Sequence, residues 1–488
     1  MEPSSTARVA NLSPTKQLLL QKRLRGEIPL STDLRNFTVL PRPQRIPLSY
    51  GQQRLWFLDQ LEAGAGSEYN MPGAWRVRGK LDRKALERAI NAIVDRHEIL
   101  RTHFAEVDGI PEQVITSRLR IDIPLKDLTG LEGTVQQDRI MEVMRREWEQ
   151  PFDLASGPVL RMTLLKLGER DHILLRTIHH IAWDAWSESI FNEEFTALYD
   201  AFLVGSDDPL KPVTAQYADF ALWQREWLEG GALQEGLNYW EQQLRGIPPS
   251  LGLPTDRPRP AIQTFDADVC QIIFPSERVA GLERLVQDNQ STLYMTSLAT
   301  LALVLSHYTG KNDIVVGSPI ADRQDAQLEK MIGFFVNTIV MRVRIEGRMS
   351  FKDLLRDVRQ TALEAYHYQY VPFEQVVRGL SPERCLDRTP VFEVLLELQN
   401  ASWESQGLKG LEIEPVGGRD LRVRFDLEVH AWHGEGKGGL YWLYNRDLFD
   451  RWRIEQMARH YARVLTSAIA DDTRTLDQLL LPTDTEEA

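Results

Sequence analysis

Hydrophobic and polar positions repeat along this chain with two periods, and together they predict an α/β protein. Apolar residues recur every three or four positions over residues 82–104 and again from Trp186 to Phe202, which predicts two amphipathic helices. Residues 158–167 and 171–180 are shorter apolar runs on either side of a turn-like GERD sequence, and this pattern predicts two paired strands.

The second half of the chain repeats the mixture. A hairpin signal surrounds a glycine-rich turn within residues 424–445. The other predicted elements are strands at 271–274, 312–319 and 337–345 and helices at 276–289, 291–310 and 450–470. Because helices and strands are mixed in both halves, each half is expected to fold as an α/β unit.

Two proline-rich stretches, residues 40–49 and 246–264, divide the chain. A chain of 488 residues exceeds the size at which a single core stops growing, so two lobes of similar size are expected. The expected organisation is a lead-in with a short helix over 1–45, an N-terminal lobe over 46–225, an inter-lobe linker over 226–265, a C-terminal lobe over 266–476 and an acidic tail over 477–488.

Composition and charge indicate which partners, metals and cellular locations to expect. The net charge of −13 argues against nucleic acid or an anionic membrane as the main partner. The most apolar window, residues 296–308, is too short to span a bilayer. Cys270 and Cys385 are too few and too far apart for a disulfide framework or a metal cluster, so we expect no metal and a reducing, cytoplasmic location. A polar N-terminus without a signal-peptide pattern agrees with that location.

The stretch LLRTIHHIAWDAWSESI, residues 174–190, carries the candidate chemistry. His179 and His180 end a predicted strand, and the near-neutral pKa of histidine suits proton transfer. Asp184 follows four positions later and could fix the loop by an ion pair. The alternative interpretation is purely structural: two histidines lie in the core and the aspartate caps the next helix.

HHIAWDAWS (179–187) resembles the HHxxxDG motif of condensation domains of nonribosomal peptide synthetases, in the chloramphenicol acetyltransferase-like superfamily. Six further stretches of the sequence resemble the other motifs of that family. In the order of that family's motifs, they are PLSYGQQRLWFLDQL (47–61), RHEILRTHF (96–104), YADFALW (217–223), IGFFVNTIVMR (332–342), QYVPFE (369–374) and DRTPVFEV (387–394). The resemblance therefore extends over about 350 residues.

The resemblance implies a fold and a reaction. The fold would be two chloramphenicol-acetyltransferase-like lobes in a V-shaped pseudo-dimer, with an active-site tunnel between them. Donor and acceptor carrier proteins would deliver thioesters on phosphopantetheine arms, and the acceptor amine would attack the donor carbonyl to form an amide. No covalently bound cofactor is expected; an adjacent adenylation domain is a further possible partner, and the protein is expected to be monomeric.

The resemblance also assigns residues. His180 matches the catalytic histidine, and His179 matches the more structural one. Asp184 matches the motif aspartate, whose partner would be Arg323 in GSPIADR. The tunnel residues expected from the same matches are Trp186, Ser187 and Asn337.

Three positions depart from the family pattern. Ala185 stands where the motif has glycine, so a tighter tunnel is expected, because glycine alone tolerates positive φ and close approach. Asp322 stands where the family commonly has glycine, and it is an alternative partner for Arg323. In the sixth motif, Tyr368 and Tyr370 replace histidine and aspartate.

Other functions remain to be separated from condensation. His179 excludes a heterocyclization domain, which has DxxxxD here, and YNMP (69–72) together with GFFVNT favours a condensation domain that accepts an L-configured donor. A non-catalytic recruitment domain and an acyltransferase that uses a free alcohol or amine are alternatives, and a pure scaffold is disfavoured by the intact histidine motif.

Overall fold

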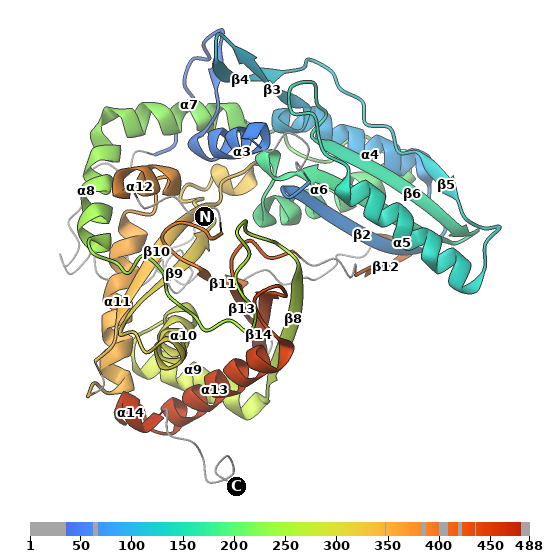
Figure 1. The fold of residues 1–488 in the computed structure, drawn as a ribbon. Coiled ribbons are helices and arrows are strands. Elements are labelled where there is room, and N and C mark those ends of the chain that lie inside the picture. The colour runs from blue at the N-terminus through green and yellow to red at the C-terminus, as the bar shows by residue number, and fades with distance from the viewer. Residues whose placement is uncertain are drawn as a thin grey trace, which may run out of the picture.

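The computed structural model describes residues 36–61, 67–346, 348–381, 387–399, 408–417, 422–434 and 436–479. These residues form two α/β lobes that meet along one side (Figure 1). The fold class predicted from the hydrophobic pattern is confirmed. The helix expected in the lead-in, Cys385 and most of the acidic tail lie outside the described residues.

The N-terminal lobe is built on a five-stranded sheet in the order β12-β2-β7-β6-β5. Strands β6 (Leu160–Gly168) and β7 (Asp171–His179) form the predicted antiparallel pair. β7 also pairs with β2 (Asn70–Gly79), and β5 (Leu125–Asp127) lies at the edge.

Helices α4 (Arg83–Arg96), α5 (Gly133–Glu149) and α6 (Ala185–Leu203) pack on this lobe. The helix predicted over 82–104 ends early, because His97 adopts an extended conformation and a short 3₁₀ turn follows. The remainder becomes β3 (Thr102–Val107), which joins β1 (Ile46–Pro47) and β4 (Ile110–Ile115) in a small sheet.

The C-terminal lobe has a six-stranded sheet in the order β10-β9-β11-β13-β14-β8. Its strands are β8 (Ala267–Phe274), β9 (Asp313–Ile320), β10 (Asn337–Arg344), β11 (Val394–Gln399), β13 (Leu427–Gly434) and β14 (Lys437–Asn445). The predicted hairpin is the β13–β14 pair. Helices α9 (Ser276–Asp288), α10 (Leu293–Thr309), α11 (Phe351–His367) and α13 (Arg451–Ala470) pack against the sheet, and the short α14 (Leu476–Leu479) follows.

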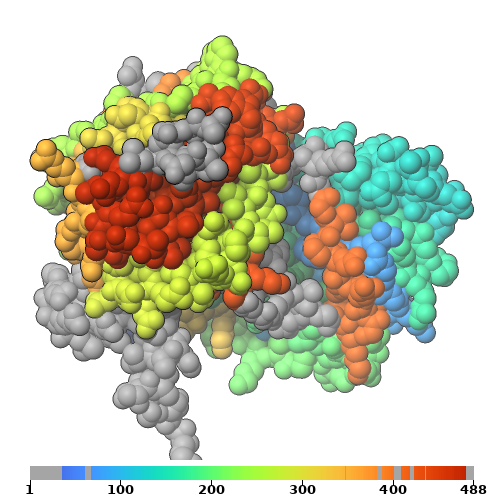
Figure 2. All heavy atoms as spheres, turned by 90° about the horizontal axis from the view of Figure 1, so that it is seen from below, coloured from blue at the N-terminus to red at the C-terminus, as the bar shows by residue number. Residues whose placement is uncertain are grey.

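Two segments of the C-terminal half belong physically to the N-terminal lobe. Strand β12 (Leu411–Pro415) pairs antiparallel with β2 and completes the N-terminal sheet. Viewed from below, the orange segment that includes β12 lies against the blue and cyan lobe (Figure 2). Residues 328–335 also place several apolar side chains in the N-terminal core, among them Phe334 and Phe335. The expected 266–476 lobe is therefore not a self-contained unit.

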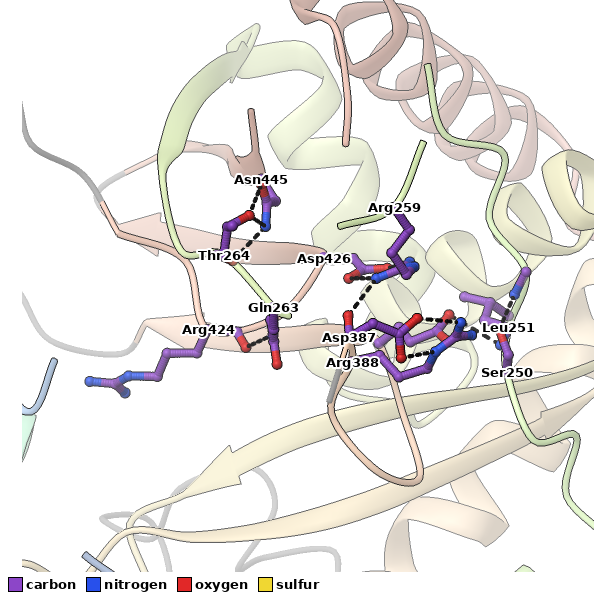
Figure 3. A network of polar contacts seen from close by, with 12 residues as sticks. Ser250, Leu251, Arg259, Gln263, Thr264, Asp387, Arg388, Arg424, Asp426 and Asn445 are labelled. Carbon is purple, nitrogen blue, oxygen red and sulfur yellow. Dashed lines mark hydrogen bonds and ion pairs between the residues drawn. The ribbon is translucent and has the colours of Figure 1, made fainter. Parts of the chain in front are cut away.

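The expected linker, 226–265, is largely fastened to the protein. Helix α7 (Tyr217–Trp227) is followed, across a kink at Gly231, by α8 (Leu233–Leu244), whose Trp240 lies in the C-terminal core. Beyond α8, Arg259 pairs with Asp426, and the Gln263 amide donates to the Arg424 carbonyl at 2.9 Å (Figure 3). The proline-rich stretch is thus a strap held on the C-terminal lobe.

Candidate active site

His179 is the last residue of β7, and its side chain is completely buried. Its ring packs against the rings of Tyr69 and Phe152, with centroids 6.3 and 6.0 Å away. Its Nδ1 accepts a hydrogen bond from the Ile181 N–H at 3.1 Å. Burial lowers the pKa of His179 to about 3, so the ring is neutral. This histidine shapes the loop from inside the core.

His180 begins the short 3₁₀ turn His180–Ala182 that follows β7. Its Nδ1 lies 2.5 Å from the Trp183 carbonyl oxygen, which can only accept, so Nδ1 carries the proton and Nε2 carries the lone pair. Burial, with the nearby charge of Arg424, lowers the pKa of His180 to about 3. His180 is therefore a neutral, oriented imidazole whose Nε2 can accept a proton or a hydrogen bond.

Asp184 both caps a helix and forms an ion pair, the two roles that the sequence offered as alternatives. As the N-cap of α6, its Oδ1 accepts the Ser187 N–H at 2.7 Å. Both carboxylate oxygens also lie 3.0 Å from Arg323 Nη2, and Oδ2 accepts the Phe335 N–H at 3.1 Å. The carboxylate is buried, and it joins the histidine loop to the segment that enters from the C-terminal half.

Arg323 is buried and pairs with Asp184, while no ion pair joins it to Asp322. Its Nη1 donates to the carbonyls of Leu328 and Met331, and its guanidinium carbon lies 3.9 Å from the centre of the Phe335 ring. Burial lowers the pKa of Arg323, and the charge of Asp184 opposes that effect. The pair is thus enclosed and shares its hydrogen bonds with the backbone.

The residues directly after Asp184 hold the same junction together. Ala185 is the exposed first residue of α6, in a helical conformation, so alanine carries no positive-φ penalty there. The Trp186 indole N–H donates to the Glu329 carbonyl at 2.9 Å. Ser187 is fully buried, and its hydroxyl lies 2.7 Å from Asp184 Oδ1 and 3.0 Å from the Gly333 carbonyl.

Asn337, the third expected tunnel residue, clamps a neighbouring loop. Its amide donates to the carbonyls of Gln369 and Val371, each at 2.7 Å, and its oxygen accepts the Phe373 N–H at 3.0 Å. All of these partners are backbone groups, so Asn337 fixes the approach to α12 (Phe373–Leu380).

Two functional neighbours were missed from the sequence. The Phe334 ring lies edge-on to His180, with centroids 4.9 Å apart, and the Tyr217 hydroxyl donates to the Phe334 carbonyl at 2.5 Å. A Cβ at Gly333 would lie 2.0 Å from the Tyr217 ring, which explains the glycine before the two phenylalanines. The motifs YADFALW and GFFVNT include these residues, but the sequence does not show that they are in contact.

Arg424 is a third neighbour without a sequence signal. Its side chain points away from the polar network that holds its backbone (Figure 3). Its guanidinium carbon lies 6.0 Å from the centre of the Tyr69 ring, and the Tyr69 carbonyl accepts the His180 N–H at 2.8 Å. A cation from the C-terminal lobe thus lies beside the histidine loop of the N-terminal lobe.

Within the described ranges, no three histidine, cysteine, aspartate or glutamate side chains are grouped in a way that could hold a metal ion. None of the described helices combines the length and apolar character needed to cross a bilayer.

Comparisons with known proteins agree on one family. A family model for the condensation domain matches residues 43–488. One of the linear gramicidin synthase proteins of Brevibacillus parabrevis is 40% identical over 451 residues, which cover 92% of this chain and 6% of that protein. Phosphinothricin tripeptide synthetase PhsC of Streptomyces viridochromogenes is 37% identical over 475 residues, covering 95% of this chain and 43% of that protein. The chain thus spans less than half the length of either relative.

Solved structures show the same fold. The X-domain from teicoplanin biosynthesis superposes with a TM-score of 0.81 at 28% identity, covering 91% of this chain and all of that one. The starter condensation domain of rhizomide synthetase superposes with a TM-score of 0.75 at 19% identity, covering 89% and 96%. The V-shaped arrangement of two acetyltransferase-like lobes expected from the sequence is confirmed by these likenesses.

Proposed function

Because this chain belongs to the condensation domain family of nonribosomal peptide synthetases, we propose that it forms an amide bond between a donor acyl or peptidyl thioester and an acceptor aminoacyl thioester. Donor and acceptor carrier proteins present both thioesters on phosphopantetheine arms. An adenylation domain of the same assembly would load the acceptor carrier.

The observation that carries this proposal is the state of His180. Its Nδ1 proton is engaged by the Trp183 carbonyl, which leaves Nε2 as the ring nitrogen that can accept from a substrate. A thioester is already activated, and an α-amine with a pKa near 8 is partly neutral at physiological pH. His180 therefore needs only to orient the amine or to accept its proton as the tetrahedral intermediate forms, while the two bound arms supply proximity.

Asp184 and Arg323 act on the geometry. Their buried pair fixes the turn that holds His180, and neither is proposed to exchange a proton with substrate. Ala185, Trp186 and Ser187 shape the surroundings of that turn, while Asn337 holds the loop before α12.

The proposal is tested by reconstitution with two carriers, one loaded with a donor and one with an acceptor. Intact-mass detection of the joined product on the acceptor carrier is the expected result. Donors of L and D configuration in parallel test the finer proposal that an L-configured donor terminus is accepted. An absence of product with every donor in a broad panel would contradict amide formation.

A recruitment role is the second candidate. An X-domain from teicoplanin biosynthesis was solved in complex with OxyB, and it shares this fold at a TM-score of 0.81 and 28% identity. The intact His179, His180 and Asp184 favour catalysis. If the chain recruited a partner and did no chemistry, the two-carrier assay would give no product and replacing His180 would change nothing.

An acyltransferase that uses a free alcohol or amine is the remaining alternative. Replacing the acceptor carrier with free amines and alcohols, and the donor carrier with coenzyme A thioesters, separates it from condensation. We expect carrier-bound substrates to react and free ones to react poorly.

A further inference from the structure

A second hollow lies next to the histidine site, and Phe334 borders both. The Phe334 ring contacts His180 at a centroid distance of 4.9 Å, and Phe334 also lines a small polar hollow of about 20 Å³, which has room for one water-sized group. Ser49, Arg54, Asp322, Asn337 and Glu374 are among its other lining residues. A group bound at His180 and a group bound in this hollow would therefore both lie next to Phe334.

The hollow holds charged groups that the protein itself does not satisfy. Arg54 lies on α3 (Tyr50–Leu61), and Glu374 lies on α12. Arg54 Nε and Glu374 Oε1 are enclosed, yet neither has a hydrogen-bond partner among the residues that the structure describes. Buried polar atoms are nearly always paired, so these two atoms, on residues that line the same hollow, offer hydrogen-bonding capacity that a bound polar group can use.

Asp322 gives the hollow its net charge. Burial raises the pKa of Glu374, and the charge of Arg54 opposes that effect. With Glu374 ionised, Arg54 balances it, and an ionised Asp322 adds one uncompensated negative charge. Arg323, the next residue, is engaged by Asp184, so it does not neutralise Asp322. Burial raises the pKa of Asp322 to about 7, and a bound cation would favour the ionised form.

Asp322 also occupies an unusual backbone position. Its φ is +43°, in the left-handed region that favours glycine, and it is the position at which the motif resemblance has glycine. Aspartate at such a position is tolerated at some cost in conformational energy. Arg54 and Glu374 lie in the first and sixth motifs of the family, whereas Asp322 departs from it. The excess charge therefore comes from the position at which this chain departs from the motif pattern.

We propose that the hollow formed by Arg54, Asp322 and Glu374 binds the cationic side chain of one of the two residues being joined, such as the ammonium of ornithine or lysine. This inference rests on the proposed condensation activity. With the reacting groups at His180, the proposal requires a long unbranched side chain that extends past Phe334, which borders both sites, and places its ammonium against Asp322. Asn337 borders the same hollow, but its amide is occupied by backbone groups and leaves recognition to the carboxylates.

The test compares ornithine with its neutral analogue norvaline, first in the acceptor position and then in the donor position, with leucine on the other carrier. In one of the two positions we expect kcat/KM to favour ornithine by roughly tenfold or more, as a charge-assisted contact supplies. Asp322→Asn and Asp322→Gly should remove most of that preference. Asp322→Gly is expected to fold, because glycine suits a φ of +43°.

A matched control is Asp325→Asn, which changes a carboxylate of the same segment outside the hollow. Equal rates for ornithine and norvaline in both positions, or a preference that survives both Asp322 variants, would overturn the inference and leave the condensation activity intact. A preference for glutamate would also overturn it, since Arg54 would then govern the hollow.

A binding measurement separates this inference from the activity itself. Calorimetric titration with the unreactive pantetheine amides of ornithine and norvaline requires no turnover. Tighter binding of the ornithine amide that is lost in Asp322→Asn supports the inference even in a protein that forms no product. Equal affinities of the two amides would contradict it.

Discussion

At the scale of single residues, one carboxylate organises the candidate site. Asp184 caps α6, pairs with Arg323 and accepts a hydrogen bond from the Phe335 N–H. The resemblance predicted the partnership of Asp184 with Arg323. The capping role was predicted as its rival, and the structure shows that one buried side chain does both.

Replacing His180 tests the chemical role most directly. His180→Ala is expected to lower the rate of product formation by about 10²–10⁴-fold, the usual worth of a positioned proton acceptor. Intact-mass kinetics on the acceptor carrier measure the rate. His433→Ala is a suitable control, because His433 pairs with Glu283 at 2.9 Å in a different part of the molecule. A parental rate in His180→Ala would remove this residue from the mechanism.

Breaking the Asp184–Arg323 pair is expected to be costly. Asp184→Ala leaves a buried guanidinium without its counter-charge, which lowers the free energy of unfolding by about 3–5 kcal/mol. Urea denaturation measures that loss. The double variant Asp184→Ala, Arg323→Met should lose less than the sum of the two single variants, since it buries no unpaired charge. Simple additivity would mean that the two side chains are energetically independent.

The hollow around Asp322 could not be predicted at this scale. The sequence showed only that Asp322 departs from the family and lies next to Arg323. Its neighbours Arg54 and Glu374 come from positions more than 260 residues earlier and about 50 residues later in the chain. Only the packing of α3 and α12 brings the three groups together.

At the scale of helices and strands, the hydrophobic pattern predicted most elements. The β6–β7 pair, the helix after Asp184 and the β13–β14 hairpin were all predicted from local periodicity. The helix over 82–104 was predicted too long, because Ile99, Leu100 and Phe104 continue the apolar pattern after the backbone has left the helix at His97. Strands and helices that pack on a core both place apolar residues against it, so periodicity alone does not show where the helix ends.

The neighbouring strands β11 and β13 carry a charge cluster whose pH dependence can be measured. His430 lies 2.9 Å from Glu397 and 3.3 Å from Glu428. Although burial opposes it, these carboxylates raise the pKa of His430 to about 9. A histidine whose folded-state pKa exceeds its unfolded value stabilises the fold fully below about pH 6.5, and this contribution is lost as the pH rises through 9.

We therefore expect the free energy of unfolding to fall by on the order of 1–3 kcal/mol between pH 7 and pH 10 because of this residue. Urea denaturation of the protein and of His430→Gln across that range isolates the effect. The variant should lose stability at pH 7 and show a flatter profile above it. Parallel profiles for the two proteins would show that His430 is not charged in the fold.

At the scale of the whole molecule, the sequence predicted two lobes but not how they share material. Composition and length indicated two cores, and the proline-rich stretch suggested a boundary. The assignment of β12 and residues 328–335 to the opposite lobe depends on long-range pairing, which leaves no periodic trace in the sequence.

This sharing predicts cooperative unfolding. The buried Asp184–Arg323 pair, strand β12 and the 328–335 segment all couple the lobes, so neither can unfold without disrupting the other. Tryptophan fluorescence and far-ultraviolet circular dichroism should report the same urea midpoint. Two separated transitions would mean that each lobe is independently stable.

Strand β12 also sets an order for how the protein is made. A ribosome completes β2, at Gly79, more than 300 residues before it reaches Leu411, so the nascent N-terminal sheet waits with one edge unpaired. A fragment that ends at residue 225 would keep that edge for good and would be prone to pair with copies of itself. Exchange of lobes between relatives is therefore expected to fail when the junction is placed in the proline-rich strap alone, unless the segment that carries β12 is exchanged together with the lobe it completes.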